Sequence, residues 1–273
     1  MLIDAHVHLT DDDYTGIEDT IVGMLRHLGI SAVSVSMDLD LNTGERNLEL
    51  AGKYSDVIIP FVGLHPWCIN LDRKEERSDG KADHNLLEDN LDKICVFIES
   101  NISRIKGIGE IGLDRAIVKD GDEFKAQIKV FERMLSIAER YGKPVSIHSR
   151  RAVDDVIDTL SSYRIKGVLL HWFSGSKKQL AIANSKGYYV SYGPVLVYSK
   201  EKQVLLSNTA RDLVLIETDG PVRYGSCFNN MMAVPSFLIS VAYAVANTLG
   251  MDYDSTTSLL FENSMRYLNM HSL

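Results

Sequence analysis

Short apolar runs alternate with longer amphipathic segments along almost the whole chain. Eight runs are rich in Val and Ile, are mostly bounded by Gly, Pro or charged residues, and predict β-strands. These runs are "LIDAHV" (2–7), "SAVSVS" (31–36), "VIIPFVG" (57–63), "RIKGIG" (104–109), "PVSIH" (144–148), "KGVLLH" (166–171), "YYVSYG" (188–193) and "LVLIET" (213–218).

The segments between these runs have the spacing of helices that bury one face. In the clearest of them, apolar residues recur every three or four positions from Phe124 to Ala138, with Lys, Glu and Arg on the opposite face. The same spacing predicts further helices over 17–29, 45–55, 86–103, 152–162, 177–187, 199–210, 234–250 and 254–270.

Regular alternation of strands with helices indicates a mostly parallel sheet. Eight strands in about 220 residues fit an α/β fold of the (β/α)₈ TIM barrel type, which usually needs roughly 250 residues. A doubly wound open sheet is the alternative, but its common G-x-G-x-x-G and Walker loops are missing from the sequence. Neither an internal repeat nor a linker interrupts the pattern, so we expect one domain over 1–273. Only the charged stretch 71–90 resembles an inserted loop, which we interpret as solvated chain leading into a helix.

Composition restricts the possible functions. The 273 residues are 45% hydrophobic and 24% charged, as is ordinary for a globular protein, and no apolar run is long enough to span a bilayer. A net charge of −8 argues against a broad nucleic-acid-binding face, and we find no secretory signal and no sign of an obligate protein partner. The cysteines, Cys68, Cys95 and Cys227, are scattered and odd in number, which indicates free thiols and a cytoplasmic location.

Residues suited to catalysis gather where the predicted strands end. Of the eight histidines, five lie at such ends, and only His27, His84 and His271 lie elsewhere. Strand ends also carry carboxylates. The residues at strand ends are His6, His8, His65, Glu110, Asp114, His148, His171, Glu217 and Asp219. In a (β/α)₈ barrel, active-site residues sit at the carboxyl-terminal ends of the strands, so we expect this set to converge.

The first strand shows what the convergence could serve. Residues at positions i and i+2 of a strand point to the same face, so His6 and His8 should project inward, stacked one above the other. Imidazoles and carboxylates together bind Zn²⁺, Mn²⁺ or a similar divalent ion. Six ligand-type residues exceed the need of one open catalytic site, and therefore two ions ~3.5–4 Å apart, bridged by a carboxylate, are the more economical interpretation.

Each of these residues also has an ordinary interpretation when taken alone. Paired histidines in a strand are often plain polar residues, Glu110 could form a salt bridge inside a barrel, and Asp219 before Gly-Pro could be a turn residue. Arg150 could belong to the start of a solvated helix. Their joint placement at one end of a barrel favours the metal site.

With these residues laid out, the sequence resembles the TatD family of metal-dependent hydrolases. The resemblance is carried by "DAHVHL", "GLHPW", "GEIGLD", "PVSIHSRRA", "HWFSGS", "IETDGP" and "ENSMRYL", which run from residue 4 to about 268. It implies that His6, His8 and Asp219 hold a first metal, that Glu110 bridges two metals, and that His148 and His171 hold the second. It also implies that His65 faces the substrate phosphate or an added ion, and that the substrate is a phosphodiester, as in DNA.

Such a site would hydrolyse the diester directly. Two divalent cations, with Zn, Mn or Mg as candidates, would offset the anionic oxygens and make a bound water acidic. We expect Asp219 to accept the proton of that water, and His65 and Arg150 to hold non-bridging oxygens. The spacing of the serines near the site suggests no covalent nucleophile.

The sequence also differs from the family pattern. "HWF" carries Trp172 where a cysteine is common, Arg115 stands where an aromatic residue is usual, and no Lys or Arg occurs from Tyr224 to Met265. The last feature favours a second hypothesis, an amidohydrolase-like enzyme acting on a small phosphoester, lactone or amide. A third is a barrel that binds metal or a partner without catalysis, although every ligand position is filled.

Overall fold

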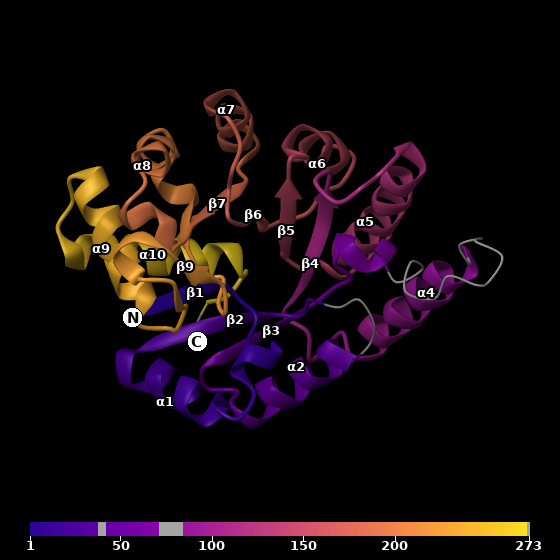
Figure 1. Cartoon of the computed structure of the whole chain (residues 1–273), viewed down its shortest axis with the longest axis horizontal. Helices are drawn as coiled ribbons and strands as arrows, with labels where there is room; N and C mark the ends of the chain where they lie inside the picture. The colour runs from indigo at the N-terminus through magenta and orange to yellow at the C-terminus, as the bar shows by residue number, and fades with distance from the viewer. Residues whose placement is uncertain (38–41, 71–83, 272–273) are drawn as a thin grey trace.

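The computed structural model describes residues 1–37, 42–70 and 84–271. Eight parallel strands follow one another in sequence order around one sheet, each paired with the next (Figure 1). The strands are β1 (Leu2–Val7), β2 (Ile30–Val35), β3 (Ile58–Val62), β4 (Gly107–Asp114), β5 (Val145–Arg150), β6 (Val168–Leu170), β7 (Tyr189–Tyr192) and β8 (Val214–Ile216). This topology confirms the predicted (β/α)₈ TIM barrel.

Helices connect the strands and lie outside them. They are α1 (Glu18–Leu28), α2 (Asn42–Lys53), α4 (His84–Ser100), α5 (Gly121–Tyr141), α6 (Val153–Leu160), α7 (Lys177–Lys186), α8 (Lys200–Ser207), α9 (Phe237–Leu249) and α10 (Tyr253–Tyr267). Short 3₁₀ turns are η1 (Asp12–Tyr14), η2 (Pro66–Asn70), η3 (Pro194–Val197), η4 (Arg211–Leu213) and η5 (Ser226–Phe228).

The predicted amphipathic patterns account for how these helices form. In α5, Phe124, Phe131 and Leu135 are buried against the barrel. The helix begins at Asp120, whose carboxylate accepts hydrogen bonds from two backbone N–H groups of the first turn, and it ends at Gly142 in the left-handed conformation. Sequence signals therefore fix both the buried face and the ends of this helix.

The barrel is nearly closed between β1 and β8. The N–H of Asp219 donates to the carbonyl of His6 at 3.0 Å, and the N–H of His8 donates to the carbonyl of Gly220 at 2.8 Å. The buried carboxylate of Asp4 accepts from the Thr218 N–H at 3.0 Å and from the Thr218 hydroxyl at 2.5 Å. The seam thus lies directly beside His6, His8 and Asp219.

A compact apolar cluster fills the other end of the barrel. It joins side chains of β1, β2, β3, β6, β7 and β8 to Tyr267 of α10. Side chains from strands on opposite sides of the barrel can contact one another only inside the barrel. Tyr267 is fully buried, and its hydroxyl donates to the carbonyl of Val145 at the start of β5. This packing leaves the carboxyl-terminal end as the open one, as in other barrels of this type.

Two details differ from the predicted elements. Strand β4 begins later than expected and runs to Asp114, so that Glu110 lies within the strand rather than after it. A small hairpin, β9 (Arg223–Tyr224) with β10 (Met231–Met232), follows β8 and was not predicted. The expected solvated loop falls largely on 71–83, outside the described residues. Within the described part of the chain, no helix has the length and apolar character needed to cross a membrane.

Candidate metal centre

The structure brings the predicted ligand residues together at the carboxyl-terminal end of the barrel. They border a cavity of about 900 Å³. Its lining includes His8, His65, Glu110, His148, Arg150, His171 and Asp219. His6 lies just beneath, fully buried. Arg150 differs from the others because it is exposed at the rim rather than in the centre.

One group of ligand atoms surrounds a common point at the β1–β8 seam. His6 Nε2 lies 3.2 Å from His8 Nε2, 3.5 Å from Glu110 Oε2 and 3.7 Å from Asp219 Oδ1. His8 Nε2 lies 3.4 Å from each of the same two carboxylates. A tetrahedral ion with ligand bonds of ~2.0–2.1 Å has ligands spaced by about 3.3–3.4 Å. These atoms therefore fit the coordination shell of one divalent cation.

A second group of nitrogens faces the other oxygen of Glu110. Oε1 lies 2.8 Å from His148 Nδ1, 2.9 Å from His171 Nε2 and 3.3 Å from His65 Nε2. His65, Glu110 and His148 also satisfy the spacing of a metal cluster on their own. The Glu110 carboxylate thus separates two sets of imidazoles, one on each oxygen.

Hydrogen bonds fix the rings of the first group. His8 Nδ1 donates to the carbonyl of Val35 at 3.0 Å, which leaves the Nε2 lone pair for a cation. His6 Nδ1 is bonded to the hydroxyl of Ser146 at 2.7 Å, so its Nε2 likewise faces the centre. The donor chemistry of the pair is therefore that of metal ligands.

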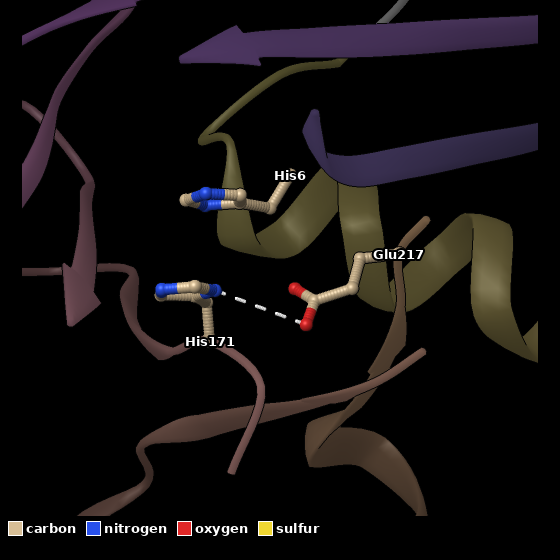
Figure 2. A group of neighbouring side chains, drawn as sticks. All are labelled: His6, His171 and Glu217. Atoms are coloured by element: carbon tan, nitrogen blue, oxygen red, sulfur yellow. Dashed lines mark ion pairs between the residues drawn. The ribbon is translucent and has the colours of Figure 1, made fainter. Parts of the chain in front are cut away.

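His6 and His8 both face the centre, with their Nε2 atoms 3.2 Å apart, but their rings meet edge to face at 85° rather than in parallel planes. His8 lies just past the end of β1. His6 instead stacks on His171, with ring centroids 3.8 Å apart and planes 3° from parallel (Figure 2).

Asp114 holds His148 from behind. Its Oδ2 lies 3.1 Å from His148 Nε2 and also accepts from the indole Nε1 of Trp67 at 2.8 Å. A carboxylate on the far nitrogen of a histidine is the usual partner of a metal-binding imidazole. The motif "GEIGLD" predicted that Asp114 lies at a strand end, but no role was predicted for it. The spacing of residues in the sequence does not show that its carboxylate contacts His148 Nε2.

His65 is held differently from the other histidines. Its Nδ1 accepts a hydrogen bond from the backbone N–H of Trp67 at 3.2 Å, so in the neutral ring the proton sits on Nε2. Burial lowers the pKa of His65 to about 4, which keeps the ring neutral. His65 therefore presents an N–H donor rather than a lone pair to the centre.

Glu217 lies beside the stacked rings of His6 and His171, as Figure 2 shows. Its Oε1 lies 3.8 Å from His171 Nδ1, which is too long for a hydrogen bond but close enough for attraction between charges. Of the buried polar side-chain atoms in the described residues, His171 Nδ1 alone lacks a hydrogen bond. Sequence reasoning noted Glu217 at its strand end without assigning it a role.

Without a cation, the site is held together by charge between imidazoles and carboxylates. Burial alone would raise the pKa of Glu110, but the charge of the facing His171 and the hydrogen bond from His148 hold it well below the usual range. For His8, burial opposes the charged form, yet the hydrogen bond to Asp219 and the charge of Glu110 raise its pKa to about 9. The same balance, with Glu110 and Glu217 as the anions, raises the pKa of His171 well above its ordinary value.

These protons occupy places that suit a metal ion. Protonated imidazoles hold the facing carboxylates in this buried group. A divalent cation can displace those protons and bind the same nitrogen and oxygen atoms. The donor set, the oriented rings and the ligand spacing all fit such an ion.

Comparison with known proteins identifies the family. The model of the family described as TatD related DNase matches residues 3–269. The chain belongs to the TatD-related DNase family. The human deoxyribonuclease TATDN3 is 28% identical over 222 residues, which cover 81% of this chain and 78% of the human protein. A metal-dependent hydrolase of Methanocaldococcus jannaschii is 24% identical over 97% of this chain and 96% of that protein.

A solved TatD homologue shows the same architecture. The crystal structure of YjjV from Escherichia coli matches with a TM-score of 0.83, covering 98% of both chains at 23% identity. This TatD chain is therefore a metal-dependent hydrolase on a (β/α)₈ barrel. The hypothesis of a barrel without catalysis is set aside.

Proposed function

We propose that this TatD protein hydrolyses phosphodiesters, with DNA as the substrate type, at a centre of two divalent cations. In this proposal His6, His8 and Asp219 hold one cation, and His148 and His171 hold the other. Glu110 bridges the two. The deoxyribonuclease name of the human relative supports the substrate type, and the hydrolase names of the relatives support the reaction.

One observation carries the proposal: the two oxygens of Glu110 serve two different sets of imidazoles. Oε2 faces His6 and His8 at 3.5 and 3.4 Å, while Oε1 faces His148 and His171 at 2.8 and 2.9 Å. A carboxylate that merely formed a salt bridge would need only one such partner. A carboxylate shared in this way is what a two-metal site requires.

The chain's own residues supply the remaining chemistry. Divalent cations, when bound, offset the charge of the phosphoryl oxygens and make water more acidic. In this proposal Asp219, which borders the cavity, would accept the proton of the attacking water. His65, through its Nε2–H, and Arg150, at the rim, would donate to non-bridging oxygens.

The types of ligand atoms indicate divalent ions but do not select one of them. Histidine and carboxylate suit Zn²⁺ and Mn²⁺, and a site with several carboxylate oxygens also accepts Mg²⁺. We propose a cytoplasmic location, which is supported by the observation that Cys68, Cys95 and Cys227 form no disulfide.

The test counts metal ions and measures hydrolysis on the same preparations. We expect two ions per wild-type chain and metal-dependent cleavage of both single-stranded DNA and a small phosphodiester. Glu110→Gln keeps the shape of the side chain but removes its charge, so we expect at most one ion and a loss of activity of about 100-fold or more. Glu262→Gln, at an exposed position of α10, is the matched control and should change neither quantity.

Two results would contradict the proposal. Full activity with two ions in Glu110→Gln would exclude the bridge. Cleavage of small esters or amides by the metal-loaded protein, with no cleavage of any phosphodiester, would favour the second hypothesis. The absence of Lys and Arg between residues 224 and 265 is the observation behind that alternative.

A further inference from the structure

The backbone of Trp172 is held in a conformation that a bulky residue rarely adopts. Its φ angle is +41°, in the left-handed region. The Trp172 N–H donates to Glu217 Oε1 at 2.8 Å, and Ser191 donates its hydroxyl to the other oxygen of that carboxylate at 2.6 Å. Glu217 is fully buried. A strained conformation persists only where its surroundings enforce it, and such residues cluster at ligand sites.

One face of the Trp172 indole is covered by Tyr224. The two rings stack with centroids 5.7 Å apart and an angle of 26° between their planes. Tyr224 is itself buried, donates its hydroxyl to the carbonyl of Thr218 at 2.8 Å, and does not border the central cavity. Trp172, in contrast, is half-buried and does border it. The indole therefore stacks on Tyr224 on one side and also borders the cavity.

The cavity wall near Trp172 includes two apolar residues, Pro221 and Val222, which follow the candidate ligand Asp219 in sequence. Arg223, the next residue along the chain, also lines the cavity and lies 3.8 Å from the carboxylate of Asp13. A substrate group on this side would be recognised by stacking and apolar contact rather than by charge.

From this geometry we infer that Trp172 determines specificity by stacking on a flat ring of the substrate. The substrate class is a nucleoside phosphate ester, whose base lies on the indole while its phosphoryl group lies over the candidate ligands. The inference rests on the proposed function for the position of the phosphoryl group. Base–aromatic stacking is effective for any base, so it selects for the ring without reading sequence.

The first experiment compares two diesters that differ only in the ring. One is a deoxyadenosine dinucleotide, and the other is the same sugar–phosphate diester without bases. We expect Trp172→Leu, which keeps apolar bulk but loses the flat face, to lower kcat/KM about 5- to 150-fold on the dinucleotide and less than about 2-fold on the abasic diester. Trp172→Phe should restore most of the loss. Equal losses on both diesters would show a structural role and overturn the inference.

The second experiment measures binding without turnover. Trp172 and Trp67 are the two tryptophans of the chain. Deoxyadenosine monophosphate should quench the fluorescence of the metal-loaded Trp67→Phe protein, in which only Trp172 emits, and should not quench that of Trp172→Phe. Deoxyribose 5-phosphate should quench neither. Quenching that is independent of the base or confined to Trp67 would overturn the inference.

The two experiments separate this inference from the proposed function. Hydrolysis of both diesters at equal rates, unchanged in Trp172→Leu, would refute stacking while the phosphodiesterase remains. Hydrolysis of neither diester, together with base-dependent quenching of Trp172, would refute the phosphodiesterase while stacking remains.

Discussion

At the scale of single residues, the histidines of the site depend on partners that do not border the cavity, among them Asp114. His148 is held by Asp114, whose Oδ1 also accepts from the Ala116 N–H at 2.8 Å. Burial raises the pKa of Asp114, but the hydrogen bonds from His148 and Trp67 hold it below the usual value. Asp114 therefore stays anionic and keeps the Nε2 proton of His148 in place, which leaves Nδ1 facing Glu110.

Replacing Asp114 by Asn should weaken metal binding without unfolding the barrel. The amide keeps the size of the side chain but removes the charge that orients the imidazole, and a change of this kind costs about 10- to 100-fold in metal affinity. Competition with a fluorescent chelator measures the affinity. Asp155→Asn is the control, because Asp155 pairs with Arg115 on the outer surface. An affinity equal to that of the wild type would remove Asp114 from the site.

Residues of this supporting kind were harder to predict than the candidate ligands. The convergence of His6, Glu110 and Asp219 could be predicted because residue types suited to metal binding stood at the ends of predicted strands, and all such ends meet at one rim. The partners of these residues could not be found. Ser146 and the Val35 carbonyl contact His6 and His8 from neighbouring strands, and nothing in the sequence pattern distinguishes them from other core positions.

At the scale of elements, the seam between β1 and β8 positions the first group of ligands. The strands share two backbone hydrogen bonds there, and the Asp4 carboxylate joins them through Thr218. Asp4 also accepts from the His6 N–H at 3.3 Å. Its three hydrogen bonds therefore connect the strand that carries His6 and His8 to the segment that carries Asp219.

Asp4→Ala should open this seam. It would leave the N–H and hydroxyl of Thr218 without their acceptor in a buried place, and each unsatisfied group costs about 1–3 kcal/mol. We expect a lower Tm of the metal-free protein and a weaker metal affinity in the same variant. Asp158→Ala, at an exposed position of α6, is the control. A lower Tm with unchanged metal affinity would show that the seam stabilises the barrel but does not position the ligands.

Element boundaries followed the hydrophobic pattern closely where strands were apolar throughout. Strand β4 was the exception, because its second half, "EIGLD", alternates carboxylates and glycine with apolar residues and resembles a loop. The two carboxylates are tolerated there because both are bonded to His148 in the candidate site. The hairpin of β9 and β10 was missed because each of its strands has only two residues, too few to produce a pattern.

At the scale of the whole molecule, the charge held in the centre ties the stability of the metal-free protein to pH. In the folded protein, Asp219 and Glu110 raise the pKa of His8 to about 9, compared with 6.5 for an ordinary exposed histidine. A histidine with a raised pKa stabilises the fold fully below pH 6.5, and this stabilisation is lost as the pH rises through about 9. His171 acts in the same direction.

Metal binding should reverse this dependence. A cation and a proton compete for the same nitrogens, so metal affinity should rise between pH 6.5 and 9, and binding at pH 7 should release at least the proton of His8. We therefore expect the Tm of the metal-free protein to fall over this interval, while the increase in Tm caused by the metal grows. Calorimetric titration in buffers of different ionisation enthalpy counts the released protons directly.

The exposed His27 of α1 provides the control for this experiment, since His27→Ala should leave both pH profiles unchanged. His8→Ala should flatten them, because it removes a proton that the cation must displace. A metal-induced increase in Tm that is the same at every pH, with no proton release, would mean that the imidazoles are already neutral. The paired charges inferred for the centre would then be wrong, although the positions of the ligands would stand.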